Sequence, residues 1–217
     1  VDRCILDSTP LIDTNVAGTQ ILLEVSRSHP VERFLQISTD EVYGDREGLG
    51  PSKEDAALTP SSPYAATKAA ADLLCFSYRR TYGIPVLITR SSNNYGPYQF
   101  PEKLMPLLIR NALNGVELPV YGDGKQIRDW LYVEDNCRAI LSVLENGQIG
   151  SVYNIGTSEE RSNLNVVEAI CAAIAERRGF EVAQLRERIR YVQDRPGHDR
   201  RYAIETLRVR DEIGWRP

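Results

Sequence analysis

The sequence predicts an α/β fold in which a doubly wound parallel sheet is followed by a smaller C-terminal α+β lobe. Short apolar runs of strand length alternate with helical stretches, which is typical of repeated β-α-β units. After about Tyr98 the predicted elements become shorter and more irregular, which indicates the second lobe. The 217 residues are 42% hydrophobic and 26% charged, an ordinary globular composition. We expect residues 1–97 to belong to the sheet domain, interleaved with part of the later chain, and residues 98–217 to form mainly the lobe.

The helices of the first half are marked by their ends. Ser8 or Thr9 is a typical N-cap with Pro10 in the first turn of the following helix. Gly83 is a typical residue at a helix C-terminus. In chain order, we expect a helix at 8–28, a strand at 33–39, a surface loop at 45–62, a helix at 63–82 and a strand at 84–89.

The second half contains shorter apolar runs separated by Gly and Pro. Asn163 or Asn165 is expected to cap one of its helices. In chain order, we expect a turn region at 93–101, a helix at 102–114, strands at 118–121 and 130–133, a helix at 134–145, a strand at 152–155, a helix ending at 178, strands at 189–192 and 202–204, and a final helix at 206–213.

Charge and cysteine usage exclude several classes of protein. A net charge of −4 gives no basic surface for a nucleic acid. No run of about 18 apolar residues predicts a membrane span. Two histidines, and four cysteines without a CxxC pair, predict no metal site. The cysteines lie in apolar or helical stretches, so we expect buried thiols and a cytoplasmic location.

Tyr64 and Lys68 are four residues apart on one predicted helix, so their side chains share a face. An ammonium group beside a phenol lowers the pKa of the phenol, which makes a base for a sugar hydroxyl near neutral pH. The YxxxK pattern is frequent by chance, and a solvated helix surface is its ordinary explanation. Its position favours chemistry, because the preceding strand ends in Thr39 and is followed by Asp40 and Glu41. Ligands bind beyond the carboxyl ends of parallel strands.

Several motifs resemble the extended short-chain dehydrogenase/reductase superfamily and, within it, the dTDP-glucose 4,6-dehydratases. They keep the family's order and spacing across essentially the whole chain. The matching blocks are 38–44 (STDEVYG), 61–68 (SSPYAATK), 92–104 (SNNYGPYQFPEKL), 118–122 (LPVYG), 128–135 (RDWLYVED), 153–156 (YNIG) and 194–203 (DRPGHDRRYA). The resemblance implies a Rossmann-like sheet, NAD as cofactor and a dTDP-sugar as substrate.

The resemblance also implies a reaction. Tyr64 would take the C4 hydroxyl proton of the sugar as NAD takes the C4 hydride, with Lys68 beside both and Thr39 bonded to a substrate oxygen. Glu41 would remove the C5 proton while Asp40 protonates the departing C6 hydroxyl, and the hydride would return to C6 and a proton to C5. The product would be a 4-keto-6-deoxy sugar nucleotide for deoxysugar biosynthesis. This division of roles needs the pKa values of Asp40 and Glu41 to differ. An acidic pair in a loop is otherwise ordinary solvated surface; here it favours a hydro-lyase over an epimerase.

The resemblance assigns binding roles to further residues. Two have ordinary alternatives, since Asn163 suits a helix N-cap and Lys103 suits an exposed helix position. The implied cofactor contacts are Thr14, Tyr64, Lys68 and Asn94. The implied substrate contacts are Asn93, Lys103, Leu104, Pro119, Val120, Tyr121, Arg128, Asn163, Asp194, Arg195, Pro196, Gly197 and His198.

The beginning of the chain departs from the family. No GxGxxG motif occurs in the sequence, and Asp2 and Arg3 match only the end of a family motif, with Cys4 where Ser is usual. The family's glycine-rich turn would precede Val1, and one more helical stretch would follow Pro217, so we expect a fragment. A UDP-glucose 4,6-dehydratase or a related nucleotide-sugar epimerase is an alternative function. A non-catalytic nucleotide-sugar-binding fragment is an alternative from another class.

The resemblance finally implies a homodimer. In the family, two helices of each subunit pack into a four-helix bundle, and the matching segments here are 8–28 and 63–82. The candidate outer face of the second helix comprises Leu73, Leu74, Phe76 and Ser77.

Overall fold

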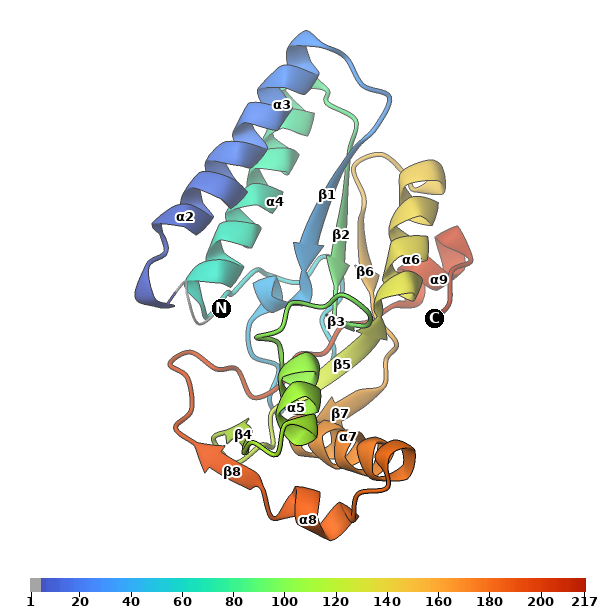
Figure 1. Cartoon of the computed structure of the whole chain (residues 1–217). Coiled ribbons are helices and arrows are strands. Elements are labelled where there is room, and N and C mark those ends of the chain that lie inside the picture. The colour runs from blue at the N-terminus through green and yellow to red at the C-terminus, as the bar shows by residue number, and fades with distance from the viewer. Residues whose placement is uncertain (1–4) are drawn as a thin grey trace.

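A three-stranded parallel sheet forms the centre of the fold in the computed structural model, which describes residues 5–217. The strands follow the order β1-β2-β6 (Figure 1). Their bounds are Phe34–Thr39 for β1, Val86–Ser91 for β2 and Val152–Ile155 for β6. Phe34 lies opposite Val86, and Ile88 lies opposite Val152. Because all three strands run in the same direction, their carboxyl ends meet at one edge.

Helices cover both faces of this sheet, as Figure 1 shows. One face carries α3 (Gly18–Ser28) and α4 (Pro63–Tyr82), and the other carries α6 (Val133–Asn146) and α9 (Leu207–Ile213). Successive side chains of β2 point to opposite faces. Val86 and Ile88 pack with Cys75 of α4, whereas Leu87 packs with Val143 of α6 and Val209 of α9. The predicted doubly wound arrangement is confirmed.

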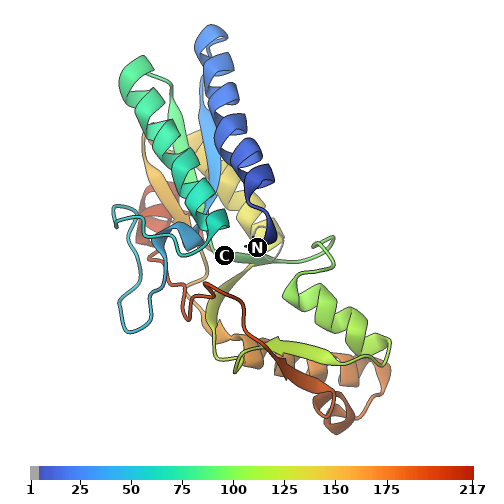
Figure 2. The same ribbon diagram turned by 90° about the vertical axis from the view of Figure 1, so that its left-hand side faces the viewer.

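The first helical segment is interrupted in its middle. A short helix α2 (Thr9–Leu11) continues as a π-helix η1 (Ile12–Ala17) before α3 begins. The helix predicted at 8–28 is confirmed, but its π-helical part was not predicted. Figure 2 shows α3 and α4 side by side, and the Tyr78 hydroxyl of α4 donates to the Glu24 carboxylate of α3 at 2.5 Å.

Helix α4 has the predicted bounds because both of its ends are set locally. The Ser62 hydroxyl accepts a hydrogen bond from the backbone N–H of Ala65 at 3.1 Å, and Pro63 occupies the first helical position. At the other end Gly83 has φ +73°, the left-handed conformation that glycine adopts without strain.

The C-terminal lobe has a core of its own. Its elements are α5 (Leu104–Leu113), β4 (Leu118–Tyr121), α7 (Asn163–Arg178), α8 (Val182–Arg186) and β8 (Ile189–Val192). Strands β4 and β8 pair in parallel. Leu108, Leu118, Val167, Cys171 and Leu185 are all buried in this core. Helix α8 was not predicted, because it is a single short turn.

A second small sheet connects the lobe to the main sheet. It comprises β3 (Asn93–Tyr95), β5 (Ile127–Tyr132) and β7 (Glu160–Ser162), in the order β3-β5-β7. The predicted turn at 93–101 therefore begins with a strand, and β7 was not predicted. Strands β3 and β7 are each three residues long, which is too short for an alternation of apolar and polar residues to be recognised in the sequence. The predicted boundary between the two domains, at residues 97 and 98, stays a prediction. Elements β6 and α6, which come later in the chain, belong to the main sheet domain.

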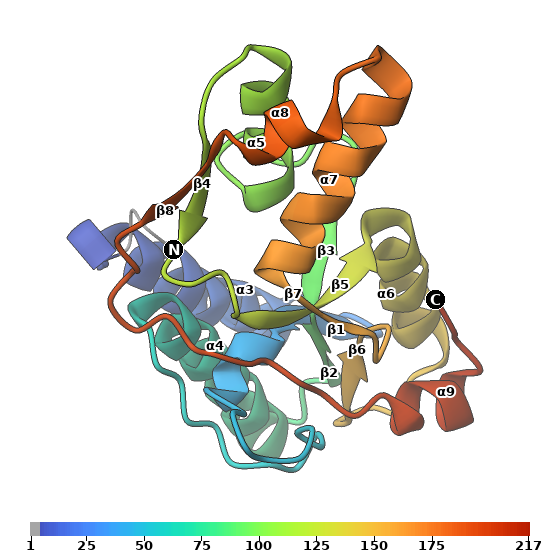
Figure 3. The same cartoon turned by 90° about the horizontal axis from the view of Figure 1, so that it is seen from below.

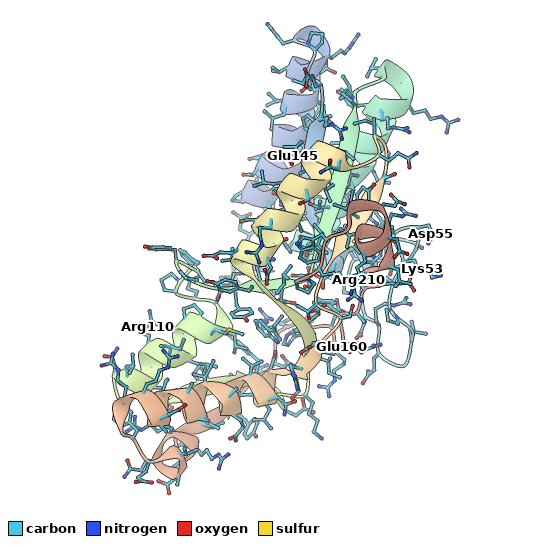
Figure 4. All side chains as sticks on the ribbon, turned by 90° about the vertical axis from the view of Figure 1, so that its right-hand side faces the viewer. Lys53, Asp55, Arg110, Glu145, Glu160 and Arg210 are labelled. Carbon is cyan, nitrogen blue, oxygen red and sulfur yellow. The ribbon has the colours of Figure 1, made fainter. Side chains whose placement is uncertain are left out.

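Residues 193–206 connect β8 to α9. Figure 3, which views the molecule from below, shows this segment crossing the lower side. The strand predicted at 202–204 is wrong. This segment makes only isolated bridges, Ser52 with Ile204 and Ile127 with Arg201, because it passes two different partners in succession. An ion pair between Arg201 and Glu160, 2.6 Å long, holds it beside β7. Glu160 is labelled in Figure 4.

Free cysteines are found at Cys75, Cys137 and Cys171. Cys75 and Cys171 are buried as expected, whereas Cys137 is exposed because it lies on the outer side of α6. Between residues 5 and 217, no helix has the length and apolar character needed to cross a membrane, and no cluster of metal-binding side chains occurs.

Candidate active site

A cavity of about 980 Å³ lies at the carboxyl edge of the main sheet and extends to the lobe. Its walls come from the ends of β1 and β2, the start of α4, β3, β4, β5 and α5, and the returning segment. Most of the predicted site residues line it. These are Thr39, Asp40, Glu41, Tyr64, Asn93, Asn94, Lys103, Leu104, Pro119, Tyr121, Arg128, Asn163, Arg195, Pro196, Gly197 and His198.

The acidic pair begins a short 3-10 helix, η2 (Asp40–Tyr43), directly after β1. Thr39 caps this helix, and its Oγ1 accepts a hydrogen bond from the Glu41 backbone N–H at 3.3 Å. The same hydroxyl donates to Asp40 Oδ1 at 3.3 Å. The cap thus fixes the Asp40 carboxyl group and the Glu41 backbone beside the cavity, where Asp40 is only 3% exposed.

The two carboxyl groups have different electrostatic surroundings. Burial, together with the smaller effect of the Glu41 charge, raises the pKa of Asp40 to about 8 against the opposing charge of Arg128. Burial also raises the pKa of Glu41, but here Arg128, Lys103 and Arg195 all oppose the increase. Asp40 is therefore protonated at neutral pH, while three cations favour the ionised form of Glu41.

Replacing Asp40 by Asn is expected to stabilise the fold increasingly as the pH rises from 3.8 to about 8. In this window the native side chain keeps its proton while the unfolded side chain loses it, so the wild type loses stability. The variant has no titrating carboxyl group at this position. Its free energy of unfolding therefore increases relative to the wild type by at most about 1.4 kcal/mol per pH unit. Urea denaturation at several pH values measures the difference, with the exposed Asp211→Asn as control. A difference independent of pH would contradict the prediction.

Tyr64 and Lys68 flank the acidic pair from α4. Tyr64 lies in the first turn and lines the cavity. Lys68 does not line it; its ammonium donates to the backbone carbonyl of Ile37 at 2.5 Å, and Ile37 itself lines the cavity. Burial lowers the pKa of Lys68, while the nearby carboxylate of Asp72 opposes that change. The Lys68 ammonium thus contacts the backbone of β1 two residues before the strand ends.

The opposite wall of the cavity is cationic. Arg128 of β5 is 5% exposed and donates from Nη2 to the backbone carbonyl of Asp199 at 2.8 Å. Its guanidinium lies 4.0 Å from the centre of the Tyr202 ring. Lys103 precedes α5, and its side chain enters from the lobe. These side chains can pair with an anionic group such as a diphosphate.

A cluster around Tyr121 closes the far end of the cavity. The Arg195 guanidinium lies 5.2 Å from the Tyr121 ring centre, and the His198 ring meets that ring edge-on at 6.4 Å. His198 Nδ1 contacts Asp194 Oδ1 at 2.6 Å, and Gln126 Nε2 donates to Asp194 Oδ2 at 2.8 Å. Asp194, predicted to touch substrate, is absent from the cavity wall and instead orients the histidine.

Two further predicted residues do not line the cavity, and their roles stay predictions. Val120 is buried in the core of the lobe, because successive residues of a strand face opposite sides and only Pro119 and Tyr121 reach the cavity. Thr14 lies exposed in the π-helical segment and is not among the residues that line the cavity.

Asn163 lines the cavity as predicted, but neither it nor Asn165 is the helix cap. Ser162 caps α7 and forms a capping box with Asn165. The matches at Asp2, Arg3 and Cys4 lie outside the residues that the structure describes.

Comparison with known proteins places this site in a family. The family model of GDP-mannose 4,6 dehydratase matches residues 1–217. The chain belongs to this family. A dTDP-glucose 4,6-dehydratase of Xanthomonas campestris pv. campestris (strain B100) is 52% identical over the whole chain. The chain spans 65% of the length of that relative.

Solved structures of this dehydratase family and of related epimerases share the fold. DesIV, a dTDP-glucose 4,6-dehydratase from Streptomyces venezuelae solved with NAD and TYD, superposes with a TM-score of 0.94 at 43% identity, over 100% of this chain and 65% of its own. A UDP-glucuronic acid 4-epimerase from Bacillus cereus superposes with a TM-score of 0.87 at 30% identity, over 97% of this chain and 64% of its own.

The cavity of this dehydratase family member contains polar groups that sequence reasoning missed. Ser92, Trp130 and Tyr202 line the cavity, although no role was predicted for them. All three lie inside the motif blocks that match the family, and this position is the sequence signal that could have pointed to them. Within the described residues, Ser92 Oγ and Trp130 Nε1 are buried without a hydrogen-bond partner, as are Asn93 Oδ1 and Asn94 Oδ1. Buried polar atoms are costly when unpaired, so these atoms are suited to binding a polar ligand.

Proposed function

We propose that this chain carries the catalytic and sugar-nucleotide-binding part of a dTDP-glucose 4,6-dehydratase, a hydro-lyase that forms dTDP-4-keto-6-deoxyglucose. The observation that carries the proposal is that Asp40, Glu41 and Tyr64 line one cavity, with Asp40 in surroundings that keep its proton. An elimination needs a base and an acid in addition to the group that accepts the C4 hydroxyl proton. The identity of about half to named dTDP-glucose 4,6-dehydratases supports the same assignment.

The residues present fit the nicotinamide end of NAD. Asn94 Oδ1 and Ser92 Oγ are buried, unpaired and beside the cavity. The Lys68 ammonium lies behind the same strand edge. NAD, when bound, supplies a hydride acceptor for C4 and the hydride for C6. Lys68 and Asn94 would hold it, together with Tyr64.

The remaining steps use side chains of this chain. Tyr64 takes the proton of the C4 hydroxyl, and Thr39 donates to a substrate oxygen. The C4 ketone acidifies the C5 proton, which Glu41 removes, while Asp40 delivers its proton to the departing C6 hydroxyl, so that water leaves. A proton returns to C5 when C6 is reduced. Arg128 and Lys103 neutralise the diphosphate across the cavity. Asn93, Leu104, Asn163 and the segment 195–198 complete the substrate site with Pro119 and Tyr121.

Turnover of three sugar nucleotides tests the function. The protein is incubated with NAD and either dTDP-glucose, UDP-glucose or GDP-mannose, and the products are identified by NMR. We expect a 4-keto-6-deoxy product from dTDP-glucose. Preference for UDP-glucose would favour the UDP-glucose dehydratase, and a C4 epimer would favour an epimerase. Tight dTDP-glucose binding without product, even in the presence of NAD, would favour the non-catalytic fragment.

We also propose that two copies associate through the outer faces of α3 and α4. Ile21, Leu22 and Val25 of α3 and Leu73 of α4 are each at least half exposed, which is costly for apolar side chains left in water. Leu74 and Phe76, predicted for this face, pack instead against the core beneath the helices. A four-helix bundle would cover the exposed side chains.

The free buried thiols support a cytoplasmic location.

Replacing Leu73 by Glu is expected to yield monomers. Leu141 on α6 is exposed to nearly the same extent, 56% against 58% for Leu73, on the opposite face of the sheet. Leu141→Glu is therefore a matched control that should remain dimeric. Sedimentation equilibrium measures both. A monomeric wild type, or a dimeric Leu73→Glu, would contradict the proposed interface.

A further inference from the structure

Arg90 is a charged residue in the middle strand of the main sheet. Every residue of β2 is buried, and Arg90 is only 2% exposed. The strand neighbours Leu87 and Ile88 are apolar, as expected for a central strand. Replacing a buried ion pair by apolar side chains is often neutral for stability, so stability alone does not explain this arginine.

The guanidinium of Arg90 joins several elements. Its Nε donates to Asp72 Oδ2 of α4 at 2.9 Å, and its Nη1 donates to the Tyr43 hydroxyl at 2.8 Å. The Tyr43 hydroxyl in turn donates to Asn154 Oδ1 of β6 at 2.8 Å. We call these four residues, Arg90, Asp72, Tyr43 and Asn154, the Arg90 network.

The Arg90 network connects the two segments that carry the proposed chemistry. Asp72 lies one helical turn beyond Lys68 on α4, the helix that begins near Tyr64. Tyr43 is the last residue of η2, which begins with Asp40. Asp72, Tyr43 and Asn154 are not among the residues that line the cavity, so they would act on the reaction through other residues.

We propose that the Arg90 network is a positioning device that fixes the Tyr64–Lys68 pair relative to the Asp40–Glu41 pair. The inference deepens the proposed function and rests on it. Oxidation at C4 and elimination across C5 and C6 must act on one bound sugar, so the two pairs need a fixed separation. Displacements of about 1 Å in such arrangements cost roughly a hundredfold in rate.

Tyr43→Phe tests the connection to η2, because it removes one hydroxyl and keeps the ring. We expect elimination to slow roughly ten- to hundredfold while KM and C4 oxidation stay near wild type. Reduced nicotinamide then accumulates transiently and is detected by its absorbance in stopped flow. Tyr153→Phe is the matched control: Tyr153 is also fully buried, and its hydroxyl bonds Glu212 at 2.7 Å away from the cavity wall. Equal slowing of both steps, or no slowing, would overturn the proposal.

A second measurement needs neither cofactor nor substrate. The chain has four lysines, at positions 53, 68, 103 and 125, so labelled lysine gives few NMR signals, and Lys68→Met identifies the one required. Asp72 and Cys75 are the titratable groups beside the Lys68 ammonium. The double variant Asp72→Asn/Arg90→Met removes both charges together and leaves no unpaired buried ion.

In the double variant we expect the pKa of Lys68 to fall below that of the wild type, because burial remains and the carboxylate is gone. An unchanged pKa would show that the network does not act on Lys68 and would overturn this arm of the proposal. A wild type that forms no product would refute the proposed function instead, and the NMR result would stand independently of it.

Discussion

Replacing Glu41 by Gln is expected to stop the proposed reaction after C4 oxidation, with product formation reduced roughly 10²- to 10⁴-fold. Gln has nearly the same shape but cannot accept the C5 proton. Tyr64, Lys68 and Thr39 are unchanged, so the C4 hydroxyl is still oxidised. Reduced cofactor should therefore accumulate in a single turnover, while NMR detects no 4-keto-6-deoxy sugar.

The matched control for this variant is Glu102→Gln. Glu102 also lines the cavity, from the exposed segment before α5, and no step is assigned to it. Its product formation should stay within about tenfold of the wild type. Normal product from Glu41→Gln would refute the assignment of the base.

Replacing Tyr64 by Phe is expected to block the reaction one step earlier, again by roughly 10²- to 10⁴-fold. The ring keeps its place at the start of α4, and only the hydroxyl that accepts the C4 proton is lost. Reduced cofactor should then not accumulate, in contrast to Glu41→Gln. The double variant Tyr64→Phe/Glu41→Gln should behave like Tyr64→Phe alone, because oxidation precedes elimination.

Tyr98→Phe is the control for the loss of a tyrosine hydroxyl. Tyr98 is fully exposed on the loop after β3 and is not among the residues that line the cavity. Reduced cofactor that accumulates in the double variant Tyr64→Phe/Glu41→Gln as fast as in Glu41→Gln would show that another group takes the C4 proton.

Local sequence signals predicted the regular elements well. The bounds of α4, β4, β6 and β8 agree with the expectation, because caps, glycine stops and apolar runs act over a few residues. Elements that depend on distant partners were missed. Strands β3 and β7 exist only because β5 lies between them, and residues 202–204 find no continuous partner strand.

The prediction of which residues line the cavity also succeeded where local signals suffice and failed where distant contacts decide. Residues at strand ends and helix starts, such as Thr39 and Tyr64, line the cavity because parallel strands end at one edge. Val120 lies in a correctly predicted strand, but its side chain is buried in the core of the lobe, and the sequence alone does not say which face of the strand is the core. Asp194 contacts His198 and does not line the cavity, so its predicted contact with substrate stays a prediction.

The sequence by itself determined the chemical groups and their local spacing: the adjacent Asp40 and Glu41 after a strand, and Tyr64 one helical turn before Lys68. Only the tertiary structure decided what those groups can do. Burial raises the pKa of Asp40, and the charges of Arg128, Lys103 and Arg195, which come from three separate segments, oppose the increase in the pKa of Glu41. Arg90 links both segments through contacts 18 and 47 residues away in the chain. Solvation and long-range pairing depend on which surfaces meet in three dimensions, and local sequence patterns do not contain that information.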